Sequence, residues 1–151
     1  MLLLLIYLRL NRTKEVALLS TLNKMFGGNG EKESKPEKKT FLNWLPLTSL
    51  EQLEMIETES NTEAVLIFKH STRCGISKMV IKQFENLFTA DHTNLKVYYL
   101  DLLNYRDISS AIGDKFQVVH QSPQLIVVRN GVSIHDAAHN DITETNLTRF
   151  I

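Results

Sequence analysis

The chain contains very little cysteine: Cys74 is the only one among 151 residues. One cysteine excludes an intramolecular disulfide and any metal site built from several thiolates. An excess of one charge is also lacking, because 17 Lys and Arg residues balance 17 Asp and Glu residues. This balance gives no strong field toward nucleic acid or an anionic membrane, so we expect neither as a partner. The cysteine content fits a reducing compartment, and we expect a cytoplasmic location.

Long apolar runs are absent apart from residues 1–10, MLLLLIYLRL. This run is too short to cross a bilayer as a helix, which needs about 20 apolar residues. No positive residue precedes it, and no small-residue cleavage pattern clearly follows it. Three interpretations stay open for the first ~20 residues: an over-extended start of translation, a secretion signal or a membrane anchor. Under the first, Met25 or a position just before it is a plausible true start.

A polar linker occupies residues 27–40, whose sequence GGNGEKESKPEKKT holds no apolar side chain. Such a segment cannot offset its ordering entropy by burying surface. We therefore expect an N-terminal extension with a linker at residues 1–40 and one folded domain at residues 41–151.

Cys74 lies at the most informative point of the sequence. It follows the apolar run 64–68 and precedes a stretch with helical periodicity, so we expect it at a strand-to-helix junction. The unpaired N–H groups of a helix N-terminus stabilise a thiolate, and Arg73, Lys69 and Lys78 add positive charge nearby. We interpret Cys74 as a reactive nucleophile. The alternative, a small buried apolar residue, fits this charged and glycine-containing neighbourhood less well.

The rest of the domain alternates between helical and strand patterns. Residues 44–47 read as extended, and Thr48 with Glu51 fits a capping box at the start of a helix to about residue 60. The next elements are a buried strand at 64–68, a helix after Cys74, a strand at 95–100 and a helix capped by Asn104. We expect these three helices to bury the following apolar residues: Leu50, Leu53, Ile56; Ile76, Val80, Phe84, Leu87, Phe88; Tyr105, Ile108, Ile112 and Phe116.

The C-terminal part predicts a hairpin. Pro123 precedes a buried strand at 125–128, and Asn130-Gly131 is the signal for a tight turn into an antiparallel strand from 132 to 134 or beyond. A last helix is expected at about 143–151, with Leu147 and Phe150 buried. Strands alternating with helices predict an α/β domain, to which the hairpin adds an antiparallel edge.

This order resembles the thioredoxin fold: a cysteine begins the helix after a central strand, and a proline precedes the closing hairpin. Four stretches also resemble the monothiol bacilliredoxin family. They are FKHSTRCGIS at 68–77, SPQL at 122–125 with Asn130-Gly131 after it, AHNDIT at 138–143, and WLPLT at 44–48 with residues 50–53 after it. The resemblance covers about residues 41–151, and residues 22–28 are similar to the short N-terminus that these proteins often have.

The resemblance implies a mechanism and a site. In that family, the cysteine exchanges bacillithiol, a low-molecular-weight thiol of some bacteria, with bacillithiolated client proteins. Carried onto this sequence, Cys74 attacks, and Pro123 is cis and faces it, while the backbone of Ser122 pairs with the client. His139, in the family-like Ala-His-Asn run, is a candidate substrate contact.

The neighbours of Cys74 complete the candidate site. Arg73 and Gly75 flank it where family members often have Thr and Pro, and Arg73, Lys69 and Lys78 are candidates for holding the carboxylates of a small acidic thiol. Ser77 occupies the position, three residues after Cys74, where a resolving cysteine often lies, so the mechanism must be monothiol. Its hydroxyl either hydrogen-bonds the thiolate or is an ordinary helix serine.

Two other functions stay open. Cys-Gly-Ile-Ser is similar to the Cys-Gly-Phe-Ser of monothiol glutaredoxins, which suggests a [2Fe–2S] carrier whose two subunits each give Cys74 and a small thiol. The other alternative is an inert thioredoxin-fold stress or interaction protein. We otherwise expect a monomer with no tightly bound cofactor and with bacillithiol as co-substrate. We expect no metal site, since His135 and His139 are four residues apart but follow a strand.

Overall fold

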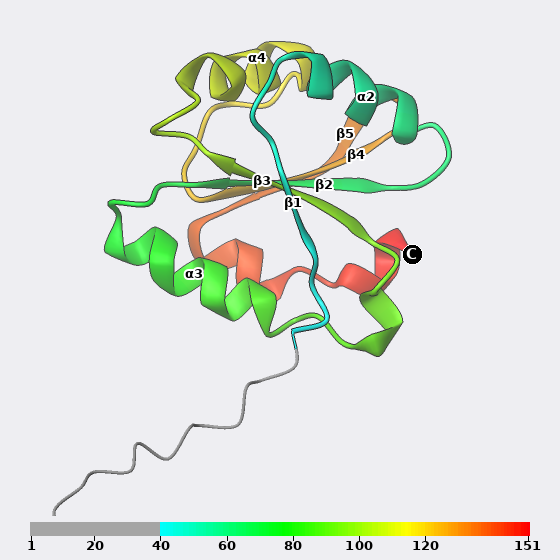
Figure 1. The fold of residues 1–151 in the computed structure, drawn as a ribbon. Coiled ribbons are helices and arrows are strands. Elements are labelled where there is room, and N and C mark those ends of the chain that lie inside the picture. Colours follow the sequence, from blue (N-terminus) through cyan, green and yellow to red (C-terminus); the bar gives the residue numbers. More distant parts are fainter. Residues whose placement is uncertain (1–39) are drawn as a thin grey trace, which may run out of the picture. The chain divides into compact units, whose positions relative to one another are not determined.

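The computed structural model describes residues 40–151, so the expectations for residues 1–39 lie outside the described residues. Figure 1 shows a central sheet with helices on both faces. The elements in chain order are β1 (Trp44–Pro46), α2 (Glu51–Glu59), β2 (Val65–His70), α3 (Gly75–Glu85), η1 (Ala90–His92), β3 (Lys96–Asp101), α4 (Arg106–Phe116), β4 (Gln124–Arg129), β5 (Val132–Ala138), η2 (His139–Glu144) and η3 (Leu147–Phe150). Within the described part, no helix is both long and apolar enough to span a membrane.

The sheet has five strands in the order β1-β3-β2-β4-β5. β1 and β2 run parallel to β3, whereas β4 runs antiparallel to both β2 and β5. The predicted α/β sheet with an antiparallel hairpin edge is thereby confirmed. Because β2 and β3 are parallel neighbours, their carboxyl ends meet at one edge of the sheet, where β4 begins.

Two apolar cores lie on opposite faces of the sheet because side chains alternate along each strand. Leu66 and Phe68 of β2 belong to the core under α3, and Val65 and Ile67 belong to the core under α2 and α4. All six residues of β2 are buried, which is the expected property of a central strand covered on both faces. Figure 1 shows α3 and the C-terminal segments on one side, with α2 and α4 on the other.

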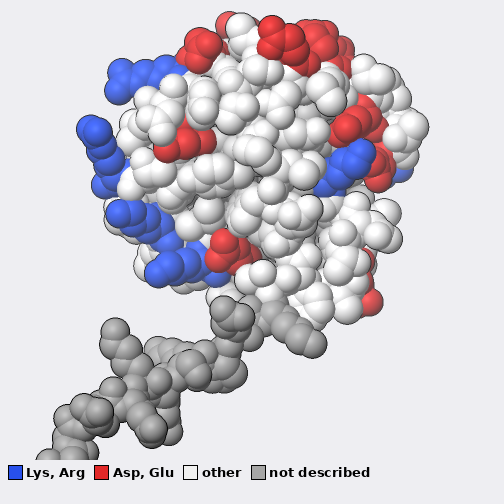
Figure 2. Space-filling model, viewed as in Figure 1, with Lys and Arg blue, Asp and Glu red and all other residues white. Residues whose placement is uncertain are grey.

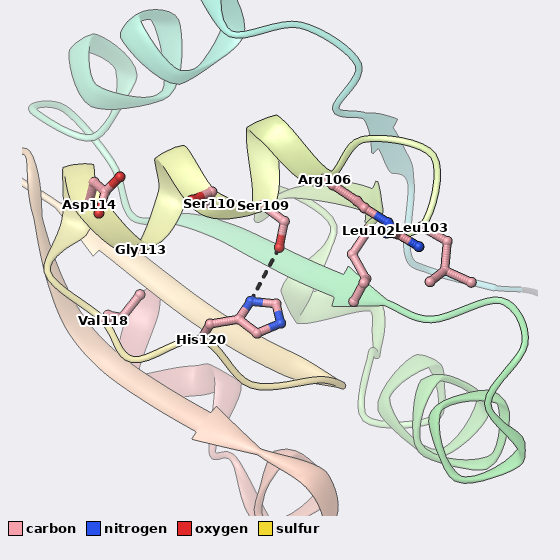
Figure 3. A pocket seen from close by; sticks show the side chains of 9 residues that line it. All are labelled: Leu102, Leu103, Arg106, Ser109, Ser110, Gly113, Asp114, Val118 and His120. Atoms are coloured by element: carbon pink, nitrogen blue, oxygen red, sulfur yellow. Dashed lines mark hydrogen bonds between the residues drawn. The ribbon is translucent and has the colours of Figure 1, made fainter.

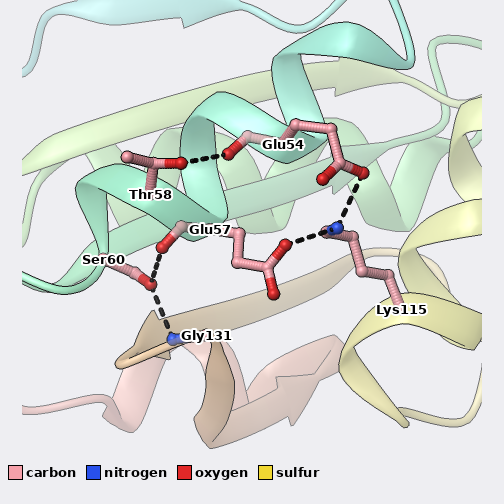
Figure 4. A network of polar contacts seen from close by, with 6 residues as sticks. All are labelled: Glu54, Glu57, Thr58, Ser60, Lys115 and Gly131. Carbon is pink, nitrogen blue, oxygen red and sulfur yellow. Dashed lines mark hydrogen bonds and ion pairs between the residues drawn. The ribbon is translucent and has the colours of Figure 1, made fainter.

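The β4–β5 turn contains the two residues that its sequence predicts. Asn130 and Gly131 have φ angles of 54° and 74°, so both take the left-handed conformation that a tight hairpin turn needs. The turn is attached to the end of α2, because the Gly131 N–H donates to Ser60 Oγ at 2.8 Å (Figure 4). In the same view, Lys115 of α4 forms ion pairs with Glu54 and Glu57 of α2, at 2.8 and 2.6 Å.

Both predicted helix caps are wrong in detail. α2 begins at Glu51 after Leu50, and no side chain caps it. Gln52 instead accepts hydrogen bonds from the N–H groups of Thr48 (2.7 Å) and Ser49 (3.0 Å), because the helix starts later than the capping box requires. Asn104 does not cap α4 either, since its side chain donates to Asp101 Oδ2 at 2.9 Å.

Other differences concern exposed apolar residues and the C-terminus. Leu50 and Ile76 were expected in the core, but they are 47% and 56% exposed because each lies at a helix start that faces away from the sheet. The expected last helix at 143–151 is replaced by two short 3-10 segments, η2 and η3, although Leu147 and Phe150 are buried as predicted. β5 extends to Ala138, whereas the sequence predicted a strand from 132 to at least 134.

We expect Phe84→Ala to lower the free energy of unfolding by about 3–5 kcal/mol, because it leaves a cavity in a close-packed core. Phe84 is fully buried, and its ring lies 5.0 Å from that of Phe68 and 5.2 Å from that of Phe88. Urea unfolding measures the change. The control is Met55→Ala, since Met55 is 54% exposed. Equal losses for both variants would contradict the described core.

Candidate active site

Cys74 is the residue immediately before α3, with extended backbone angles of φ −94° and ψ 124°. Its carbonyl accepts from the N–H of Lys78 at 3.1 Å, and its own N–H donates to the Ser71 carbonyl at 3.1 Å. These two hydrogen bonds hold Cys74 in place as the last residue of the loop between β2 and α3. The thiol is free and partly exposed. Cys74 therefore stands at the N-terminus of α3, next to the first helical turn, whose N–H groups have no partners within the helix.

The residues around Cys74 form an accessible surface. Arg73, Gly75 and Ile76 are all exposed. A side chain at Gly75 would meet no atom within 4 Å, so glycine leaves open space beside the thiol. Figure 2 shows Lys and Arg side chains gathered along the edge where β2 passes into α3, and Asp and Glu over α2 and α4. The surface at Cys74 thus combines a positive rim with an exposed apolar residue.

The Ser77 hydroxyl is bonded within the protein and makes no hydrogen bond to the Cys74 sulfur. It accepts from the Ser71 N–H at 3.1 Å and lies 2.7 Å from His70 Nδ1. Both Ser77 and His70 are buried. The two roles considered for Ser77 were a hydrogen bond to the thiolate and that of an ordinary helix serine. The structure instead shows its hydroxyl joined to Ser71 in the loop before Cys74 and to His70. Sequence reasoning did not find its partner His70, although the position of His70 at the end of β2, on the face of α3, was a usable signal.

The Ser122–Pro123 peptide bond is cis, as predicted. Pro123 precedes Gln124, which pairs with Lys69 at the end of β2, so the proline lies at the same sheet edge as the Cys74 loop. Its carbonyl accepts from the His139 N–H at 3.1 Å, which brings His139 to this edge as well. His139 is exposed and has a left-handed backbone with φ 54°.

Ser122 has unused hydrogen-bonding groups at this edge. Within residues 40–151, its Oγ is buried without a partner, and no hydrogen bond engages its backbone. An extended peptide that lies along the proline loop could pair with the backbone groups of Ser122, as an added strand does.

Lys69 was expected near the carboxylates of a ligand, but its side chain is fully buried on the α4 face of the sheet, opposite α3. Its Nζ donates to His120 Nδ1 at 2.8 Å and to Gln124 Oε1 at 3.0 Å. Because side chains alternate along β2, Lys69 and His70 face opposite sides, so Lys69 does not reach the surface beside Cys74. The structure thus separates Lys69 from Arg73 and Lys78, which are exposed. No group of three His, Cys, Asp or Glu residues in the described part could hold a metal ion.

The fold and this edge define a thioredoxin-fold redox protein. A solved oxidoreductase with a thioredoxin fold is 31% identical, with a TM-score of 0.60, over 70% of this chain and 91% of that one. Thioredoxins of Malassezia sympodialis and Schistosoma mansoni share the fold at 20% and 19% identity and TM-scores of 0.57 and 0.55, over 70% and 73% of this chain and 88% and 100% of theirs.

The family is more specific than the fold. Residues 45–147 match the sequence model of the monothiol bacilliredoxin BrxC, which covers more than half of the chain. The chain therefore belongs to the monothiol bacilliredoxin family, and the resemblance seen in the sequence is confirmed.

We expect the free energy of unfolding to fall as the pH drops from about 7 toward 5, in part through His70. Burial lowers the pKa of His70, and nearby Lys78 lowers it further against the opposing effect of Asp101. The unfolded chain therefore takes up this proton near pH 6.5, before the folded protein does, and proton uptake favours unfolding. Burial also lowers the pKa values of His120 and His135.

His70→Asn tests this contribution, since its Oδ1 can accept from Ser77 but cannot titrate. Urea unfolding between pH 7 and 5 should give a shallower decrease in stability for His70→Asn than for the unaltered protein. Ile76→Val is the control, because this side chain is exposed and does not titrate. An unchanged slope in His70→Asn would show that His70 does not contribute.

Proposed function

We propose that this protein removes bacillithiol from bacillithiolated client proteins through a mixed disulfide on Cys74. The observation that carries the proposal is a free, partly exposed thiol at the start of α3, at the sheet edge where the cis Pro123 lies. Membership of the monothiol bacilliredoxin family supports bacillithiol as the small thiol. Neither a disulfide nor a second thiol within this chain is needed for this reaction, because the second thiol comes from solution.

The first step transfers the small thiol. The Cys74 thiolate attacks the bacillithiol sulfur of the client mixed disulfide, and the client–bacillithiol S–S bond breaks as the Cys74–bacillithiol bond forms. The client cysteine leaves as a thiolate and takes up a proton from water. Attack on the bacillithiol sulfur, rather than on the client sulfur, releases the client directly.

The second step regenerates Cys74. Because Ser77 stands where a resolving cysteine often lies, a second bacillithiol thiolate from solution attacks the bacillithiol sulfur held by Cys74. The products are bacillithiol disulfide and the free Cys74 thiolate, so no net oxidation of this protein occurs. We infer that it acts in the cytoplasm, as a monomer with bacillithiol as co-substrate and no tightly bound cofactor.

The proposed docking of the client uses the groups that the fold leaves unpaired. The backbone of Ser122 would pair with an extended client segment, and exposed Ile76 would contact an apolar side chain. Arg73, Gly75 and His139 are exposed around the same edge, and we propose them as substrate contacts.

We expect Cys74→Ser to abolish the release of bacillithiol from a bacillithiolated client, because a hydroxyl cannot replace the thiolate nucleophile. Mass spectrometry measures the loss of the adduct from the client and its appearance on the unaltered protein. Lys82→Ala, at an exposed position of α3, is the control and should keep the reaction. A reaction that continues in Cys74→Ser would overturn the proposal.

Further experiments on the unaltered protein distinguish the proposed function from the two alternatives. Anaerobic reconstitution with iron and sulfide should leave a colourless monomer, whereas a dimer that absorbs visible light would support a [2Fe–2S] carrier. Clients modified with glutathione or cysteine should release the adduct more slowly than bacillithiolated ones. A Cys74 that reacts with none of these disulfides would indicate an inert member of the fold.

A further inference from the structure

Lys69 places a positive charge inside the protein without a carboxylate beside it. Its side chain is fully buried, and its two hydrogen-bond acceptors, His120 and Gln124, are uncharged groups. No ion pair reaches Lys69 from any residue in the described part of the chain. Burial lowers the pKa of Lys69 to about 8, so the amine is mostly charged at neutral pH. A buried charge is costly unless an opposite charge compensates it.

The negative charge that compensates Lys69 acts through an intervening amide. Gln124 accepts from Lys69 through Oε1 and donates from Nε2 to Asp136 Oδ1 at 2.8 Å. The amide thus stands between the ammonium and the Asp136 carboxylate, whose charge raises the pKa of Lys69 against the larger effect of burial. The charge of Lys69 is therefore only partly balanced from the β5 side.

On its other side, Lys69 determines which ring nitrogen of His120 carries the proton. An ammonium can only donate, so His120 Nδ1 is the acceptor and the ring carries its proton on Nε2. Figure 3 shows the His120 ring in the wall of an open cleft beside α4. The Nε2–H is therefore available as a donor to a ligand in this cleft.

The cleft has a volume of about 550 Å³ and is lined by residues of α4 and of the loops at 102–103 and 118–120. Arg106, Ser109, Ser110 and His120 give it donors, and its only carboxylate is Asp114. In Figure 3, Asp114 and Arg106 lie at opposite ends of the helix segment that borders the cleft. The end near Arg106 thus combines a guanidinium and hydroxyl donors with the buried charge behind His120.

This cleft adjoins the edge that carries Cys74. The Leu102 N–H donates to the His70 carbonyl at 3.0 Å, which joins the cleft loop to the last residue of β2. His120 is followed within three residues by the cis Pro123, so one short segment borders both the cleft and the proline loop.

We propose that the cleft binds a carboxylate of the small thiol that Cys74 takes from its client, with Arg106 and His120 as the direct donors and Lys69 as the buried countercharge. This inference rests on the proposed function. An anion at this position would neutralise the ammonium from the side that Asp136 does not reach. Lys69 and His120 would then be specificity-determining residues on the face opposite α3.

Lys69→Met separates binding from folding. After the substitution, Gln124 Oε1 keeps its donor from the Gln121 N–H, and Ser109 Oγ can still donate to His120 Nδ1. Removal of the buried charge should therefore raise the urea midpoint, while the affinity of the cleft falls at least about tenfold. A loss of affinity in a protein that is more stable cannot be attributed to unfolding.

The experiment titrates the full chain carrying Cys74→Ser with succinate, succinamide, phosphate and reduced bacillithiol at pH 7. NMR follows the His120 ring and the backbone amides of the cleft residues, and the amides alone measure binding in His120→Asn. Succinate and bacillithiol should shift His120, and uncharged succinamide should not. Arg106→Ala and His120→Asn should each weaken binding about tenfold. His120→Asn keeps an acceptor for Lys69, but its shorter side chain has no N–H at the position of Nε2. Lys82→Ala on α3 is the control and should bind as before.

The outcomes separate this inference from the proposed function. If unaltered Cys74 exchanges bacillithiol but neither succinate nor bacillithiol shifts His120, the cleft assignment is wrong and the function stands. If succinate binds but Cys74 exchanges no bacillithiol, the function fails and the assignment of the ligand fails with it. Binding of phosphate in preference to succinate and bacillithiol would also overturn the ligand, and unchanged affinity in Lys69→Met would overturn the role of the buried charge.

Discussion

The parallel pairing of β2 with β3, together with the antiparallel pairing of β2 with β4, is the constraint on which the site depends. It brings the ends of β2 and β3 and the beginning of β4 to one edge of the sheet. The chain must leave that edge through a loop that begins α3, which places Cys74 at a helix N-terminus. It must also approach β4 through the segment that contains the cis Pro123. Cys74 and the cis Pro123 therefore lie at the same edge because of backbone pairing, although their positions in the sequence differ by 49.

The last two residues of β2 support the two sides of this edge differently. His70 points toward α3 and bonds Ser77, so it holds the loop that carries the thiol. Lys69 points toward α4 and bonds His120 and Gln124, so it holds the segment that leads to Pro123. Both pairs are polar groups buried at the end of an otherwise apolar strand, where each unpaired group would be costly. The polar pairs thus fix two loops that secondary structure alone would leave free to move.

Much of the architecture was predictable because it follows from local patterns. The apolar run of β2, the Asn130-Gly131 turn and the helical stripe of α3 each identified their elements, since burial and turn geometry dominate there. The capping box was wrong because Gln52, one position beyond Glu51, bonds the preceding N–H groups. The last helix was wrong because Leu147 and Phe150 are buried equally well from short 3-10 segments, so their periodicity did not specify an α-helix.

The candidate chemistry could be recognised from the sequence, because the single thiol, the lack of a resolving cysteine and the strand-to-helix junction are local features. Which polar side chains face each other could not be predicted in this way. Lys69 read as a surface charge near Cys74, yet the pleat of β2 directs it to the opposite face, beneath His120. Ser77 was interpreted either as a partner of the thiolate or as an ordinary helix serine, and its hydroxyl in fact bonds His70. The physical reason is that contacts across a sheet depend on strand order and on which face each side chain occupies, and neither is encoded within a single segment.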